Sequence, residues 1–247
     1  MALMKTSNPA LSANTFRLPY AGAGESMTIS GAVNKTGILL VCAVLTAAWS
    51  WNRFTVSPET AGLPLMIGLV GGLIVALVTI FKKEWAPVTA PLYALLEGLV
   101  LGSVSAMYEA RFHGIAIQAV GLTFGTLFGL LVAYRAGVIR VTEKFKLGVI
   151  AATGGIAIFY LAQFVLSFFG VHFAAINGSG TLGIGFSVAV VIVAALNLVL
   201  DFAFIETGAR SGAPKYMEWY AAFGLMVTLV WLYLEILRLL SKINSRN

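Results

Sequence analysis

The chain has 247 residues, of which 59% are hydrophobic and only 11% charged, and its formal net charge is +6. An ordinary soluble domain carries about 25% charged residues, so this composition excludes a water-soluble globular protein. Lipid solvates apolar side chains and penalises charged ones, and the sequence therefore predicts a polytopic α-helical membrane protein without a soluble catalytic domain.

The first 34 residues are rich in Ser, Asn, Gly and Pro and lack the basic-then-apolar layout of a signal peptide. We expect residues 1–34 to form a polar cytosolic tail and residues 35–247 to form the transmembrane domain. Residues 28–31 can begin an amphipathic segment that leads into the first span.

Seven apolar runs follow, and each approaches the roughly 20 residues that cross the hydrocarbon of a bilayer. We expect them at residues 36–51, 63–81, 87–108, 115–134, 147–170, 182–205 and 219–240. The first run is short for a full span and is expected to borrow flanking residues. The predicted fold class is an all-α membrane protein with seven transmembrane helices.

Basic residues orient these spans. If the amino terminus lies inside, eleven lysines and arginines fall in inner segments and five in outer ones. The positive-inside rule then favours a cytoplasmic amino terminus, and we expect a bacterial inner membrane. The basic carboxyl terminus disagrees, and it would lie inside if the last run were re-entrant; we expect seven full spans. The basic residues cluster beside apolar runs instead of forming a stripe, so the expected partner is the lipid bilayer and not nucleic acid.

Glycines recur at four-residue spacing on three predicted spans, which is typical of closely packed membrane helices. We expect packing within the bundle, with homodimerisation as the alternative. The glycines are Gly68 and Gly72 on the second span, Gly98 and Gly102 on the third, and Gly121, Gly125 and Gly129 on the fourth.

The motifs of membrane enzymes are missing from the sequence. It contains no HExxH, GxSxG or P-loop, and Asp201 is its only aspartate, which excludes a two-aspartate intramembrane protease. We expect no enzymatic activity, no cofactor and no resident metal, although Ca²⁺ can bind transiently.

The strongest functional signal is a set of acids inside apolar runs. A charged side chain there costs about 2.5 to 3.5 kcal/mol on insertion scales, so such a residue is a functional candidate. Glu97 lies near the middle of the third run, Asp201 near the inner end of the sixth, and Glu218 at the start of the seventh. We predict that these three residues form an ion pathway or pH sensor, because carboxylates inside a bundle can coordinate hard cations and titrate. Glu97 held by a neighbouring helix, and Glu218 at a helix dipole, are the structural alternatives.

Four further residues are expected to support this pathway. Asn197 lies one turn before Asp201 and adds a second polar group to its face, whereas Glu206 is expected to be a solvated charge at the helix end. Glu235 and Arg238 lie three residues apart and are expected to form a local pair near the interface.

Several short motifs resemble the Bax inhibitor-1 family of seven-helix membrane proteins, in its bacterial branch. They are EGLVLG at 97–102, LD at 200–201, APKYMEWY at 213–220 and YLEILRLL at 233–240. The resemblance covers nearly the whole chain and implies six helices around a central seventh, with a pH-dependent calcium leak.

The same resemblance implies a gate formed by two aspartates, one on the sixth and one on the seventh helix, with an arginine latch. Asp201 matches the first aspartate. The place of the second falls at residues 226–229, which contain no acid, and the second span contains no arginine. Glu218 is the expected substitute because it begins the seventh helix on the same side as Asp201, whereas Glu235 lies about 24 Å further along.

Two hypotheses of different class stay open. The first is a pH-sensitive calcium or cation leak channel gated by these carboxylates. The second is a non-conducting interaction protein that regulates stress survival or membrane proteolysis, with a membrane-protein partner bound through the amino-terminal tail. A small-molecule transporter is a third hypothesis, weakened because no repeats or paired broken helices are evident.

Overall fold

Long apolar helices make up nearly all of the regular structure in this computed structural model, which describes residues 25–57, 59, 62–170 and 173–246. Within these described residues, seven helices are long and apolar enough to cross a membrane. They are α1 (Ile29–Val56), α2 (Gly62–Phe81), α3 (Ala86–Arg111), α4 (Ile115–Arg135), α5 (Glu143–Ser167), α7 (Thr181–Arg210) and α8 (Met217–Asn244). Two short elements, η4 (Lys83–Trp85) and α6 (Ala174–Asn177), lie in the connections.

Each predicted apolar run corresponds to one of these helices, which confirms the all-α seven-helix prediction. The first helix does borrow flanking residues, since α1 has 28 residues and extends past both ends of the predicted run. Its start at Ile29 lies inside the stretch predicted as a polar tail, because Thr28 caps the helix by accepting a hydrogen bond from the Gly31 amide. Residues 1–24 of that predicted tail lie outside the described residues.

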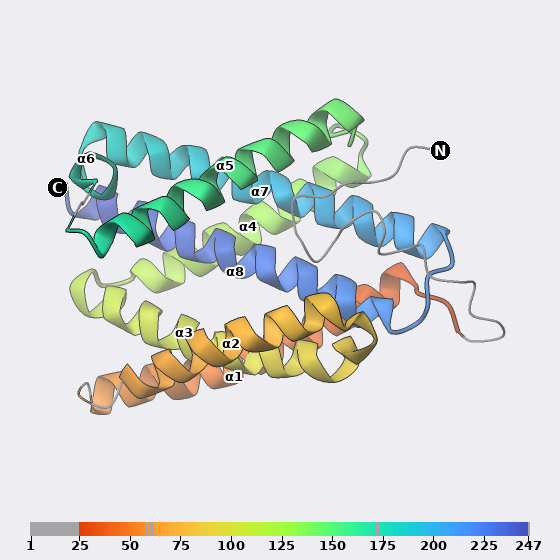
Figure 1. Cartoon of the computed structure of the whole chain (residues 1–247), viewed down its shortest axis with the longest axis horizontal. Helices are drawn as coiled ribbons and strands as arrows, with labels where there is room; N and C mark the ends of the chain where they lie inside the picture. Colours follow the sequence, from red (N-terminus) through yellow and green to blue (C-terminus); the bar gives the residue numbers. More distant parts are fainter. Residues whose placement is uncertain (1–24, 58, 60–61, 171–172, 247) are drawn as a thin grey trace.

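Helix α8 is the central element of the bundle. It crosses the middle of the view in Figure 1, between α1, α2 and α3 on one side and α5 and α7 on the other. It packs against α1, α3, α4 and α7, and most of its length is buried. Helix α5 is peripheral and has few buried residues, so most of its apolar surface faces outward, as expected for a helix surrounded by lipid.

Glycine allows the closest helix contacts, but not at all of the predicted positions. A Cβ on Gly98 would lie 2.3 Å from the Ala43 carbonyl oxygen of α1, and one on Gly68 would lie 2.6 Å from the Leu96 carbonyl oxygen of α3. The prediction of packing within the bundle is wrong for the fourth span, because α4 turns its glycine face outward. A Cβ would meet nothing within 4 Å at Gly121, Gly125 or Gly129.

This difference predicts opposite effects of alanine on two helices. Gly98→Ala should lower the free energy of unfolding by about 1 to 3 kcal/mol, because the methyl group would strike backbone of α1 that cannot move aside. Gly125→Ala should be neutral or slightly stabilising, since it gains helix propensity in open space. Thermal unfolding in detergent measures both variants, and equal midpoints would contradict the α1–α3 packing.

Candidate functional site at the α7–α8 interface

Asp201 lies in the interior of the bundle, on the face of α7 that packs against α8. Its side chain is 1% exposed and lies beside the Thr228 hydroxyl of α8. The second carboxyl oxygen, Oδ2, has no hydrogen-bond partner among the residues that the structure describes. Buried polar atoms in proteins are nearly always paired, so an orphaned carboxyl oxygen between two core helices marks this position as the candidate site.

Thr228 lies within residues 226–229, where the family resemblance implies a second acid. Its hydroxyl oxygen also lies 3.3 Å from the Gly224 carbonyl oxygen one turn earlier on α8. A hydroxyl group has one hydrogen to donate and can accept further hydrogen bonds. Thr228 can therefore donate to Gly224 while it accepts from a protonated Asp201, or donate to an ionised Asp201 and release Gly224.

Asn197 is buried one turn before Asp201 but contacts a different helix. Its amide nitrogen donates to the Thr153 hydroxyl of α5 at 2.8 Å and to the Val193 carbonyl oxygen at 2.8 Å. The sequence correctly places Asn197 and Asp201 in the interior. Their partners differ because the face of α7 that they share lies between α5 and α8.

Glu218 does not approach Asp201, and the expectation that it replaces the second acid is wrong in this structure. Its carboxylate accepts hydrogen bonds from the amide and hydroxyl of Thr28, both at 2.9 Å, and lies 2.6 Å from the Lys35 ammonium. Thr228 lies ten residues further along α8, which is about 15 Å of helix axis at 1.5 Å per residue. Helix geometry therefore keeps Glu218 at the end of the bundle.

The result is a staple between the amino-terminal ends of α1 and α8. Gly31 makes room for it, since a Cβ there would lie 2.0 Å from the Glu218 carboxylate. The Met27 amide also donates to the Ala213 carbonyl oxygen at 2.7 Å, in the turn where Gly212 adopts a φ of 66°. The Lys215 ammonium lies 3.3 Å from Glu218 Oε1. We name the group of Thr28, Lys35, Lys215 and Glu218 the amino-terminal staple.

Glu97 and Glu206 also lie apart from Asp201. Glu97 is half-buried, lies beside Tyr93 of its own helix, and faces Gly72 of α2. Glu206 accepts a hydrogen bond from Tyr134 of α4 at 2.5 Å and pairs with Arg210 at 2.6 Å. It links two helices instead of being the solvated end charge that the sequence predicts.

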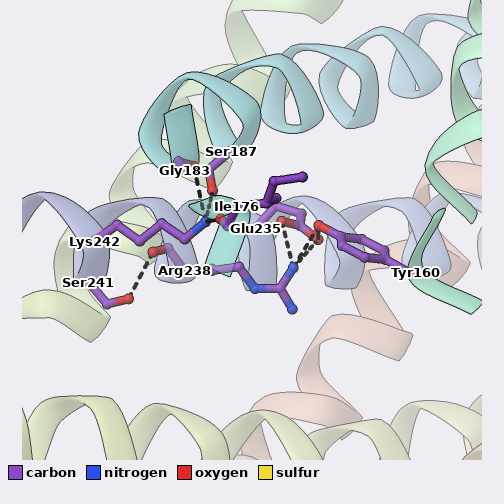
Figure 2. Close-up of polar contacts among 8 residues, drawn as sticks. All are labelled: Tyr160, Ile176, Gly183, Ser187, Glu235, Arg238, Ser241 and Lys242. Carbon is purple, nitrogen blue, oxygen red and sulfur yellow. Dashed lines mark hydrogen bonds and ion pairs between the residues drawn. The ribbon is translucent and has the colours of Figure 1, made fainter. Parts of the chain in front are cut away.

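A second polar cluster lies at the carboxyl-terminal end of α8 (Figure 2). The predicted pair is present there, with an Arg238 nitrogen 3.0 Å from Glu235 Oε1. Both residues also contact the Tyr160 hydroxyl of α5, which donates to Glu235 at 3.1 Å. Two turns after Glu235, the buried Lys242 ammonium contacts one oxygen atom of α6 and two of α7, so both charged groups join α8 to its neighbours.

Comparison with known proteins identifies the family of this bundle. The family model described as Bax inhibitor 1 like matches residues 8–245, which is almost the entire chain. The chain belongs to the Bax inhibitor 1 like family. No curated protein and no solved structure matches it.

The site of this Bax inhibitor 1 like protein differs from the gate that the sequence resemblance implies. One acid, Asp201, faces one hydroxyl group, Thr228, at the position where that resemblance implies two aspartates. Sequence reasoning also missed Thr153, Tyr160 and Lys242. A lysine seven residues after Glu235, on the same face of an apolar helix, was the available signal for the last of these.

The amino-terminal staple predicts a large loss of stability on Glu218→Gln. Glu218 is fully buried, and removing its charge leaves the Lys35 ammonium without its ionic partner, at a cost of about 3 kcal/mol. The hydrogen bond to Glu218 also raises the pKa of Lys215, so the variant should lower that pKa. Thermal unfolding and the pH dependence of Lys215 acylation measure the two effects.

Glu143→Gln is the matched control, because the carboxylate that it removes is 60% exposed, although its partner Lys146 is 10% exposed. Loss of this pair should cost less than about 1 kcal/mol. A Glu218→Gln protein as stable as this control would show that the staple does not hold α1 against α8.

Proposed function

We propose that this chain is a proton-sensitive cation leak in which cations and protons compete for Asp201. One observation carries the proposal: the carboxyl group of Asp201 is 1% exposed, lies between the two most buried helices, and has an oxygen without a hydrogen-bond partner. An acid inside a membrane bundle is by default a candidate for an ion or proton pathway.

The Thr228 hydroxyl supplies the coupling between protonation and helix contact. With Asp201 protonated, the chain Asp201–Thr228–Gly224 carbonyl is satisfied and joins α7 to α8 through neutral groups. With Asp201 ionised, the hydroxyl must turn toward the carboxylate, and a charged oxygen is left in apolar surroundings. A cation that enters from either side would compensate that charge, which makes ionisation and cation entry favour each other.

The chemistry of the site favours transient binding. Ca²⁺ prefers six to eight oxygen ligands at about 2.3 to 2.6 Å, and one carboxylate with one hydroxyl supplies only part of such a shell. Conduction requires binding that is weak enough for the ion to leave. A single acid at the α7–α8 interface therefore suits a leak better than a storage site. The lysines of the amino-terminal staple support a cytoplasmic location for that end of the bundle.

Calcium flux from liposomes containing the purified protein tests this function. Flux should fall as the medium is acidified, because protons and Ca²⁺ compete for the same oxygens. Asp201→Asn should remove that pH dependence and lower the flux at high pH by about tenfold or more, whereas Glu143→Gln should behave as the wild type. An Asp201→Asn protein with an unchanged pH profile would exclude Asp201 from the mechanism.

Thr228→Asp is a complementary gain-of-function variant, since it places a second carboxyl group beside the first. Two adjacent acids share protons and bind a divalent cation better than one. We therefore expect a steeper pH dependence and a higher preference for Ca²⁺ over K⁺ than in the wild type.

A second candidate function, a non-conducting interaction protein, is favoured by the lack of a second acid beside Asp201. Thr228 is not an acid, and Glu218 is held in the amino-terminal staple, so no second carboxylate completes the expected gate. Its proposed contact segment, the amino-terminal tail, lies outside the described residues. Deleting residues 1–24 separates the two candidates: a leak persists in liposomes, whereas a partner-dependent role in stress survival or membrane proteolysis is lost in cells.

A further inference from the structure

Buried polar residues recur every seventh position along α8. Thr228, Glu235 and Lys242 are 3%, 3% and 8% exposed and lie on one face of the helix, because seven residues make almost two turns. Each contacts a polar side chain of α5 or α7, namely Asp201, Tyr160 and Ser187, respectively.

We name these six residues the polar seam. Fourteen residues separate Thr228 from Lys242, which is about 21 Å along the helix axis. The hydrocarbon of a bilayer is about 30 Å thick, so the seam covers much of its depth. Asn197 and Thr153 add a further polar contact between α7 and α5. Such a row is costly in a membrane helix and marks a candidate route for ions.

Lys242 ends the seam in a cage of oxygen atoms (Figure 2). Its ammonium group donates to the Ile176 carbonyl oxygen at 2.8 Å, the Gly183 carbonyl oxygen at 3.0 Å and the Ser187 hydroxyl at 2.8 Å. These atoms come from α6 and from the first turns of α7. The segment that joins α6 to α7 packs closely against the start of α7. Only glycine fits at position 183, since a Cβ there would lie 2.1 Å from the Gly178 carbonyl oxygen.

The cage has the chemistry of a monovalent cation site. Three donors of one ammonium group meet three oxygen acceptors, two of them backbone carbonyls of the kind that replace the hydration shell of K⁺ in channels. Its distances of 2.8 to 3.0 Å exceed the 2.3 to 2.6 Å of Ca²⁺ coordination. The cage therefore suits a potassium-sized ion better than Ca²⁺.

We propose that this oxygen cage is a monovalent-cation site at the end of the ion route, and that the tethered ammonium of Lys242 occupies it and closes the route. The route rests on the proposed function, whereas the cage does not. Conduction requires Lys242 to leave the cage, and its positive charge repels other cations while it stays.

Lys242→Ala tests both parts of the inference. Potassium flux into liposomes should rise by about tenfold or more over the wild type. The thermal unfolding midpoint of the variant in detergent should rise with added K⁺ but not with tetramethylammonium, because only an ion of the right size fits the vacated oxygens. The wild type should show no such dependence. Arg246→Met is the matched control, since it removes an exposed positive charge near the same end of the chain.

Ser187→Ala is a milder variant that keeps Lys242 and removes one cage oxygen, and it should raise the potassium flux a few-fold. The inference would be overturned if folded Lys242→Ala and Ser187→Ala proteins had an unchanged potassium flux and no K⁺-dependent unfolding midpoint. The proposed function would still hold in that case if the calcium flux depended on Asp201. A K⁺-dependent midpoint without flux in any protein would support the cage and remove the leak. If Lys242→Ala does not fold, an unchanged flux in Ser187→Ala overturns the closure.

Discussion

Hydrocarbon offers no hydrogen bonds, so every polar group inside this bundle must find its partner within the protein. The contact between Asp201 and Thr228 meets that requirement only in part, because one carboxyl oxygen has no hydrogen-bond partner. The contact joins α7 to α8, and α8 is the helix around which the others pack. In the proposed function, the protonation state of Asp201 is coupled to the packing of these two central helices.

The two ends of α8 are held by different interactions. At its amino-terminal end, Glu218 binds the capped start of α1 and two lysines, which fixes α8 against α1. At its carboxyl-terminal end, the contacts of Glu235 and Lys242 run to α5, α6 and α7. A movement of α7 relative to α8 would leave the amino-terminal contact with α1 intact. It would break the contacts of Asp201 and Lys242, which lie at opposite ends of the polar seam.

Hydropathy alone predicts the seven helices, because apolar runs of about 20 residues have few alternatives to a membrane helix. The family is indicated by short motifs and not by hydropathy. Hydropathy also places Asp201 in the interior. The sequence does not predict which face of a helix packs against a neighbour. Glycines at four-residue spacing give the same pattern whether they face another helix or lipid, and Gly121, Gly125 and Gly129 face outward. The partner of Glu218 was equally hidden, since Thr28 lies 190 residues away in the sequence.

The direct test of competition at Asp201 is its reaction with an apolar carbodiimide, which modifies carboxyl groups within membranes. The modified residue is located by mass spectrometry in protein reconstituted at constant pH. The account predicts that modification of Asp201 slows as Ca²⁺ is added, because the ion occupies the same oxygens, and that Glu143 shows no such protection. A rate at Asp201 that does not depend on Ca²⁺, in vesicles that conduct Ca²⁺, would contradict the central claim.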